Sequence, residues 1–133
     1  EANEIAPYKR PLSSMTPTIV MKDNELFFTT GSPGGARIIS AVLQSILNII
    51  DFEMNLEEAT KARRVHHQWQ PDVLEIEYYI DDKANKELID IGYSVKIRRP
   101  LTCIQTIMYK DGKYYGYGDF RRPDAYASGN IND

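Results

Sequence analysis

Two adjacent hydroxyl side chains, Ser13 and Ser14, lie between Pro11 and Pro17, directly before a β-branched run. Two hydroxyls can hydrogen-bond a carboxylate without a catalytic base, and the flanking prolines limit the entropy lost in holding them still. The alternative is a local bond from hydroxyl to backbone, which serines in such positions commonly make. A nucleophilic serine would need a neighbouring base, and the sequence offers no Ser-His-Asp spacing. The pair is therefore a candidate carboxylate-binding site.

A glycine pair, Gly34 and Gly35, follows Pro33 and precedes a long apolar run. Two consecutive N–H groups at the start of a helix form a site for negative charge, which the helix dipole strengthens. In an acyl-transfer enzyme such a site is an oxyanion hole, and removing one donor costs about 3 kcal/mol of barrier. The alternative is a tight turn at positive φ, a conformation that glycine adopts without strain.

The two histidines, His66 and His67, are adjacent in the stretch VHHQWQPD. Adjacent side chains point to opposite sides of a strand, so this pair does not suit a shared metal ion. We expect both imidazoles and Trp69 to pack a loop against the protein, and we expect no metal site.

The elements that would position these motifs begin with an extended lead-in over residues 1–17. Residues 18–30 contain two strand-like runs around a turn at Asp23-Asn24, which predicts a β-hairpin. Residues 36–50 then place apolar side chains around more than half of a helical circumference. This pattern predicts a helix buried against a sheet.

A second helix is predicted to start at Asn55, which forms a capping-box pattern with Glu58, and to run through residues 56–65. Pro71 prevents regular structure soon after it. A strand, an amphipathic helix and three further strands are predicted next, at residues 73–79, 81–92, 93–98, 103–109 and 113–118. Asp81 or Asp82 would lie near the start of the helix and Gly92 would end it. A turn at Asp111-Gly112 would join the last two strands as a second hairpin. The order predicts an α+β fold with helices layered on largely antiparallel sheets.

Composition excludes several classes of protein. The chain has 133 residues, of which 42% are hydrophobic and 26% charged. This composition is typical of a globular domain or a piece of one. The net charge of −3 argues against a general nucleic-acid binder. We expect four basic pairs on solvated faces: Lys9-Arg10, Arg63-Arg64, Arg98-Arg99 and Arg121-Arg122.

The single cysteine, Cys103, excludes an internal disulfide and a cysteine zinc cluster. It falls in an apolar alternating run, so we expect a buried core residue. No apolar run approaches the ~18 residues of a membrane span. The first residues lack the pattern of a signal peptide.

Together these stretches resemble the γ-glutamyltranspeptidase family, also called glutathione hydrolases. Phe120 departs from the family's pattern, which usually has proline there. The matching motifs occur in the family's order and spacing across nearly the whole chain: PYKRPLSSMTPTIV, GSPGGARII, VLQ, LEEAT, ARRVHHQWQPD and GDFRRPDAYASG. The resemblance covers the C-terminal part of the small subunit, so residues 1–133 are expected to be one domain or part of one. It implies the four-layer αββα fold of N-terminal-nucleophile hydrolases, of which this chain would be a part.

The resemblance also implies an enzyme, a γ-glutamyltransferase or glutathione hydrolase, made as a precursor that cuts itself into a large and a small subunit. The family's nucleophile is the threonine freed at the N-terminus of the small subunit, and its own α-amine can serve as base. It attacks the γ-carbonyl of a γ-glutamyl amide such as glutathione, and the acyl group passes to water, an amino acid or a peptide. No cofactor is implied. Family members are commonly periplasmic, secreted or surface-anchored.

Carried over residue by residue, Ser13 and Ser14 match serines that bind the substrate's α-carboxylate. Gly34 and Gly35 match glycines whose N–H groups form the oxyanion hole. The chain begins at Glu1, so we expect it to lack the nucleophilic threonine and to be inactive alone. The acidic residues that bind the α-amine are expected from the N-terminal part of the small subunit, and an arginine of the α-carboxylate site from the large subunit.

The expected partners are therefore a glutathione-like γ-glutamyl substrate, the large subunit and the rest of the small subunit, with a homo-oligomer left open. One alternative is a relative of the same fold that acts on another amide, such as a cephalosporin-type acylase or a poly-γ-glutamate depolymerase. Ser13-Ser14 favours a substrate with a free α-carboxylate. The other alternative is a non-catalytic module that binds a small anion or a partner.

Overall fold

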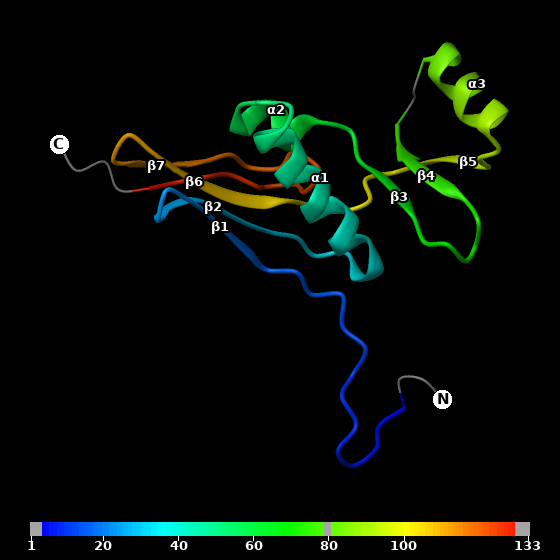
Figure 1. Ribbon diagram of the computed structural model, residues 1–133, viewed down its shortest axis with the longest axis horizontal. Helices are drawn as coiled ribbons and strands as arrows, with labels where there is room; N and C mark the ends of the chain where they lie inside the picture. The colour runs from blue at the N-terminus through cyan, green and yellow to red at the C-terminus, as the bar shows by residue number, and fades with distance from the viewer. Residues whose placement is uncertain (1–3, 79–80, 130–133) are drawn as a thin grey trace.

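A computed structural model describes residues 4–78 and 81–129 (Figure 1). Glu1 and Tyr79, which belong to the predictions above, lie outside these residues. The elements follow one another along the chain in the order β1 Thr18–Lys22, β2 Glu25–Gly31, the 3₁₀ helix η1 Gly35–Arg37, α1 Ile38–Ile50, α2 Leu56–Lys61, β3 Val65–His67, β4 Leu74–Glu77, α3 Asp82–Ile91, β5 Val95–Arg98, β6 Gln105–Lys110 and β7 Lys113–Gly116.

The strands form two sheets, a four-stranded one in the order β1-β2-β6-β7 and a three-stranded one in the order β3-β4-β5. In the four-stranded sheet every neighbouring pair is antiparallel. Asp23 and Asn24 both have positive φ in the β1–β2 turn, as do Asp111 and Gly112 in the β6–β7 turn. Two-residue hairpin turns of this kind match the twist of the strands, and both predicted hairpins are confirmed.

One face of the four-stranded sheet packs against α1 and α2. Val20 and Met108 are the register partners of Phe28, and this row faces the helices. Phe28 is fully buried there, against Ile49 of α1 and Ala59 of α2. Burial of a side chain of this size contributes about 2 to 3 kcal/mol. The row therefore fixes the helices on the sheet.

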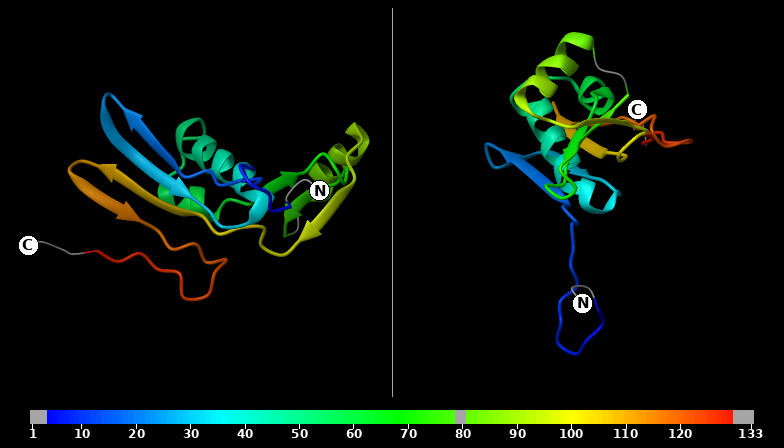
Figure 2. Two further views of the ribbon diagram at one scale, coloured as in Figure 1. Left: turned by 90° about the horizontal axis from the view of Figure 1, so that it is seen from below. Right: turned by 90° about the vertical axis from the view of Figure 1, so that its right-hand side faces the viewer.

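The opposite face of this sheet and the outer side of α1 leave apolar side chains exposed. Ile19 and Ile107 face away from the helices and are 69% and 51% exposed. Ile39 and Leu43 of α1 are 54% and 53% exposed. The predicted packing of this helix against a sheet is confirmed, but within this chain only one face of α1 meets the sheet, so the apolar residues on its other side are exposed. Both hairpin tips also extend beyond the helices (Figures 1 and 2).

The predicted capping box at the start of α2 is confirmed. The Glu58 amide donates to Asn55 Oδ1 and the Asn55 amide to Glu58 Oε2, each at 3.0 Å. The helix ends at Lys61 rather than near residue 65, because Ala62 adopts extended φ and ψ. The chain then forms β3, a strand that the sequence analysis missed.

The outer edge of β3 is covered by a side chain of α1. Gln44 donates to the Val65 carbonyl at 2.8 Å and accepts from the Val65 amide at 2.9 Å. It thereby makes the two hydrogen bonds that a neighbouring strand would make. An edge strand with satisfied backbone groups is protected from pairing with another chain.

The three-stranded sheet includes one parallel pair, β4 and β5, joined through α3. A parallel connection needs a crossover, and α3 supplies it. The other described strand pairs are antiparallel, in agreement with the predicted largely antiparallel sheets. The boundaries of α3 are as predicted, since Asp81 caps its start through the Ala84 amide and Gly92 ends it at φ 110°.

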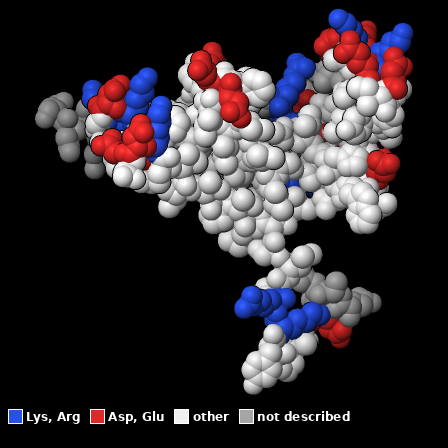
Figure 3. Space-filling view, viewed as in Figure 1, with Lys and Arg blue, Asp and Glu red and all other residues white. Residues whose placement is uncertain are grey.

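The lead-in projects from the body in Figure 1 and in the right view of Figure 2. Figure 3 shows charged side chains gathered at the hairpin tips and over α3, while the surface over α1 is largely uncharged. Among the described residues, none of the helices has the length and apolarity required to cross a membrane.

Candidate active site

The glycine pair forms an exposed turn between β2 and α1. Gly34 has φ 143° and Gly35 has φ 58°, so both need the left-handed region that glycine tolerates. Gly35 starts η1, which leads directly into α1, so a short 3₁₀ turn separates the pair from the long helix. Within residues 4–78 and 81–129, neither glycine amide donates a hydrogen bond to the protein. Both donors are free to bind a negative group.

Arg37, two residues after the glycine pair, is anchored to the three-stranded sheet. Arg37 Nε and Nη2 lie 2.8 Å and 2.7 Å from Glu75 Oε2, and Arg98 binds the other oxygen of the same carboxylate. Burial alone would raise the pKa of Glu75, but the hydrogen bonds and charges of the two arginines outweigh it and lower the pKa. Glu75 therefore stays ionised and fixes η1 against β4.

The serine pair lies in the extended lead-in before β1. The Met15 amide donates to Ser13 Oγ at 3.2 Å, and Thr16 Oγ1 donates to the Ser14 carbonyl at 2.9 Å. Ser13 therefore makes the local backbone contact considered above, which holds its hydroxyl oxygen in place. Ser13 is exposed and Ser14 half-buried.

The two motifs leave the sheet at the same end. Thr18, at the start of β1, pairs with Thr30, near the end of β2, so residues 13–17 and 32–35 continue from adjacent strand ends. Among the described residues, no hydrogen bond joins the serines to the glycines. The structure brings the motifs to one end of the sheet without direct contact.

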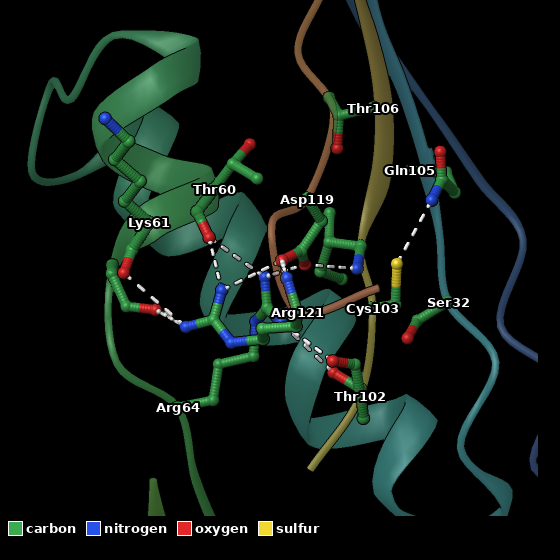
Figure 4. Close-up of polar contacts among 12 residues, drawn as sticks. Ser32, Thr60, Lys61, Arg64, Thr102, Cys103, Gln105, Thr106, Asp119 and Arg121 are labelled. Atoms are coloured by element: carbon green, nitrogen blue, oxygen red, sulfur yellow. Dashed lines mark hydrogen bonds and ion pairs between the residues drawn. The ribbon is translucent and has the colours of Figure 1, made fainter. Parts of the chain in front are cut away.

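Behind the glycine turn lie four charged side chains that we call the buried charge cluster: Arg64, Glu77, Asp119 and Arg121. Arg64 Nη2 lies 2.8 Å from Asp119 Oδ2, and Arg121 Nη1 lies 3.1 Å from Asp119 Oδ1 (Figure 4). Arg121 also binds Glu77 Oε2 at 2.8 Å. The side chains of all four are at most 4% exposed. The expectation of solvated arginine pairs is therefore wrong for Arg64 and Arg121.

Both arginines also donate to backbone carbonyls at the end of α2. Arg64 and Arg121 both donate to the Thr60 carbonyl, and Arg121 also donates to the Ala62 carbonyl at 2.8 Å. Burial alone would raise the pKa of Asp119, but the charge of Arg64 and backbone donors such as the Ile104 amide lower it. Two positive and two negative charges balance, which is the condition for burying them.

Only part of the histidine stretch packs against the protein, whereas both imidazoles and Trp69 were predicted to do so. His66 is buried in β3, with Nδ1 2.5 Å from Ser40 Oγ and Nε2 2.8 Å from Gln68 Oε1. His67 points outward and lies 3.0 Å from Asp72, whereas Trp69 is 78% exposed and packs nothing down. Within the described ranges, no three His, Cys, Asp or Glu side chains are arranged to hold a metal ion. The buried position of Cys103 is confirmed.

Comparison with known proteins decides the family. The profile of the family described as Gamma-glutamyltranspeptidase matches residues 1–129. This chain belongs to the γ-glutamyltranspeptidase family. The glutathione hydrolase proenzyme of Escherichia coli (strain K12) is 46% identical over 130 residues, which are 97% of this chain and 22% of that protein. The glutathione hydrolase proenzyme of Pseudomonas sp. (strain A14) is 40% identical over 140 residues, 97% of this chain and 24% of that protein.

A solved γ-glutamyltranspeptidase has the same fold over this region. The crystal structure from Helicobacter pylori superposes with a TM-score of 0.85 at 43% identity, covering 92% of this chain and 68% of that chain. The chain is thus part of the αββα N-terminal-nucleophile hydrolase fold, as the motifs predicted. It spans 22% to 24% of the length of these curated relatives.

Proposed function

We propose that the protein carrying this chain cleaves γ-glutamyl amide bonds through a γ-glutamyl-enzyme and transfers the acyl group to water, an amino acid or a peptide. In this proposal the chain supplies the oxyanion hole, Gly34 and Gly35, and part of the α-carboxylate site, Ser13 and Ser14. The family assignment supports the reaction class. The nucleophilic threonine and the groups that bind the α-amine would come from the rest of the protein.

The observation that carries the proposal is the exposed turn with two free amides. When a nucleophile adds to the γ-carbonyl, its oxygen gains negative charge, and donors aimed at that oxygen act mainly in the transition state. The N–H groups of Gly34 and Gly35 have no protein acceptor among the described residues, so they need not break a bond to accept it. The turn is also fixed before substrate arrives, because Arg37 is bound to Glu75.

The serine pair would act on the opposite end of the substrate. Hydroxyl groups can donate to a carboxylate, and the lead-in leaves the sheet beside the glycine turn. Binding the α-carboxylate at a fixed distance from the glycines would hold the γ-carbonyl in place, and such positioning can supply several kcal/mol of rate acceleration. In this proposal the serines bind the substrate and the glycines act in the chemical step.

The test is a pair of substitutions in the full protein, assayed with a γ-glutamyl anilide. Gly35→Ala is preferred to Gly34→Ala, because a Cβ at Gly35 meets nothing within 4 Å whereas one at Gly34 would collide with Thr102. Strain at φ 58° displaces the amide, so we expect kcat to fall at least about tenfold with a smaller change in KM. Ser14→Ala should mainly raise KM.

Two results would contradict the proposal. Swapped effects, with Gly35→Ala acting on KM and Ser14→Ala on kcat, would overturn the roles. A wild-type protein that cuts itself normally yet releases no glutamate would overturn the reaction. Faster turnover of glutaryl anilide or poly-γ-glutamate than of γ-glutamyl anilide would favour the related acylase or depolymerase activity.

A further inference from the structure

The segment between β5 and β6 is held by the buried charge cluster. The Leu101 amide donates to Glu77 Oε1 at 2.7 Å, and the Ile104 amide donates to Asp119 Oδ2 at 2.8 Å. Both carboxylates are fully buried, so these charge-assisted bonds are shielded from water. Residues 101–104 therefore have a fixed backbone although they precede the sheet.

Thr102 lies in the middle of this segment and contacts both the cluster and the glycine turn. Arg64 Nη1 donates to the Thr102 carbonyl at 3.3 Å and to its hydroxyl at 3.4 Å (Figure 4). The methyl group of Thr102 lies against Gly34, where an added Cβ would come within 2.8 Å of Thr102 Cγ2. The hydroxyl thus faces the arginine and the methyl faces the glycine.

We propose that Thr102 is a positioning residue for the Gly34–Gly35 turn, and this inference rests on the oxyanion role proposed above. Its methyl group supports the α-carbon of Gly34 from behind and so sets where the free amides point. Its carbonyl and hydroxyl connect that support to Arg64 and, through Arg64, to Asp119. A backbone displacement of about 1 Å at a reacting site can cost up to about a hundredfold in rate.

The two ends of the Thr102 side chain can be separated by two conservative substitutions. Thr102→Ser removes the methyl that contacts Gly34 and keeps the hydroxyl for Arg64. Thr102→Val keeps the methyl and removes the hydroxyl, while Arg64 retains its bond to the residue 102 carbonyl. A merely structural role would make Thr102→Val the more harmful change, because it leaves a buried donor with one acceptor fewer.

We would measure kcat, KM and thermal midpoint for both variants of the full protein with a γ-glutamyl anilide. We expect Thr102→Ser to lower kcat about tenfold with less than about a twofold change in KM, because the support acts on the transition-state donors. Thr102→Val should keep kcat within about twofold of wild type and lower the thermal midpoint. Crystal structures should show the Gly34 α-carbon moved towards residue 102 in Thr102→Ser alone.

Wild-type kcat in Thr102→Ser, a loss confined to KM, or equal kcat losses in both variants would overturn the positioning role. A wild-type protein without γ-glutamyl activity would instead overturn the proposed function. The crystal structures still decide the positioning in that case, since an unmoved Gly34 in Thr102→Ser would refute it on its own.

Discussion

Arg64 and Arg121 are buried because each has a carboxylate partner far away in the chain. Arg64 is 55 residues from Asp119, and Arg121 is 44 residues from Glu77. The glycine and serine motifs could be found in the sequence, because their chemistry lies in adjacent residues. The buried charge cluster could not be found in the sequence. A pair of adjacent arginines has the same sequence pattern whether it is solvated or paired with a distant aspartate. The motif GDFRRPD, which contains Asp119 and Arg121, drew attention in the sequence only through the family resemblance.

At this scale we predict that Asp119→Asn destabilises the protein strongly. The substitution keeps the shape of the side chain but leaves the buried charge cluster with one excess positive charge. Breaking one partner of a buried ion pair costs about 3 to 5 kcal/mol in free energy of unfolding. Urea denaturation of the full protein measures it, with the exposed Asp124→Asn from the same motif as control. A loss below 1 kcal/mol, equal to the control, would mean that the cluster relaxes or admits water.

At the scale of elements, the starts and ends of helices were predicted better than the pairing of strands. The cap Asn55 and the stop at Gly92 lie where they were predicted, and Asp81 is the one of the two predicted candidates that caps α3. Each of these residues acts on its own neighbours. The strand β3 was missed because its three residues are too short for a periodic pattern. Its existence depends on β4 at one edge and on Gln44 at the other. The parallel β4–β5 pair likewise depends on how α3 crosses over.

The capping box of α2 gives a prediction at this scale. Asn55→Ala removes the acceptor of the Glu58 amide, so we expect a loss of about 1 kcal/mol in the free energy of unfolding. Asn55→Asp keeps an acceptor and adds a favourable charge at the helix start, so it should remain close to wild type. Chemical denaturation of both variants measures the difference. Equal losses in the two variants would show that the side chain acts by packing rather than by capping.

Apolar surface is left uncovered on two sides of the molecule, the outer side of α1 and the sheet face turned away from the helices. Apolar side chains of the four-stranded sheet and of α1 are exposed, as expected of a chain that forms part of a larger αββα fold. The sequence shows that these residues are apolar, but it does not show which faces of the sheet and of α1 are covered within this chain. The matched region is 22% of the length of the Escherichia coli relative.

The whole molecule should also lose stability in acid. The pKa values of Glu75 and Asp119 are lowered in the fold from ordinary values of 4.5 and 3.8, so the unfolded chain binds protons more readily. Stability contributed by these groups is present above the ordinary pKa and is lost as pH falls towards the folded one. Glu75→Gln should therefore destabilise most at pH 7, with a difference from wild type that shrinks towards pH 3.

Urea unfolding of wild type and Glu75→Gln at several pH values measures this difference. Glu87→Gln on α3 is the matched control, because Glu87 is 63% exposed and should show little change at any pH. A Glu75→Gln difference that stays constant with pH would show that the ion pairs with Arg37 and Arg98 do not account for the stability of η1.

The long sequence separation within the buried charge cluster also sets an order of events during synthesis. Arg64 leaves the ribosome 55 residues before Asp119, a delay of about 3 to 11 s at ordinary elongation rates. Until then the buried charge cluster lacks one of its two carboxylates, and the segment that backs Gly34 lacks one of its two anchors. A nascent chain interrupted before residue 119 would therefore hold that segment through Glu77 alone.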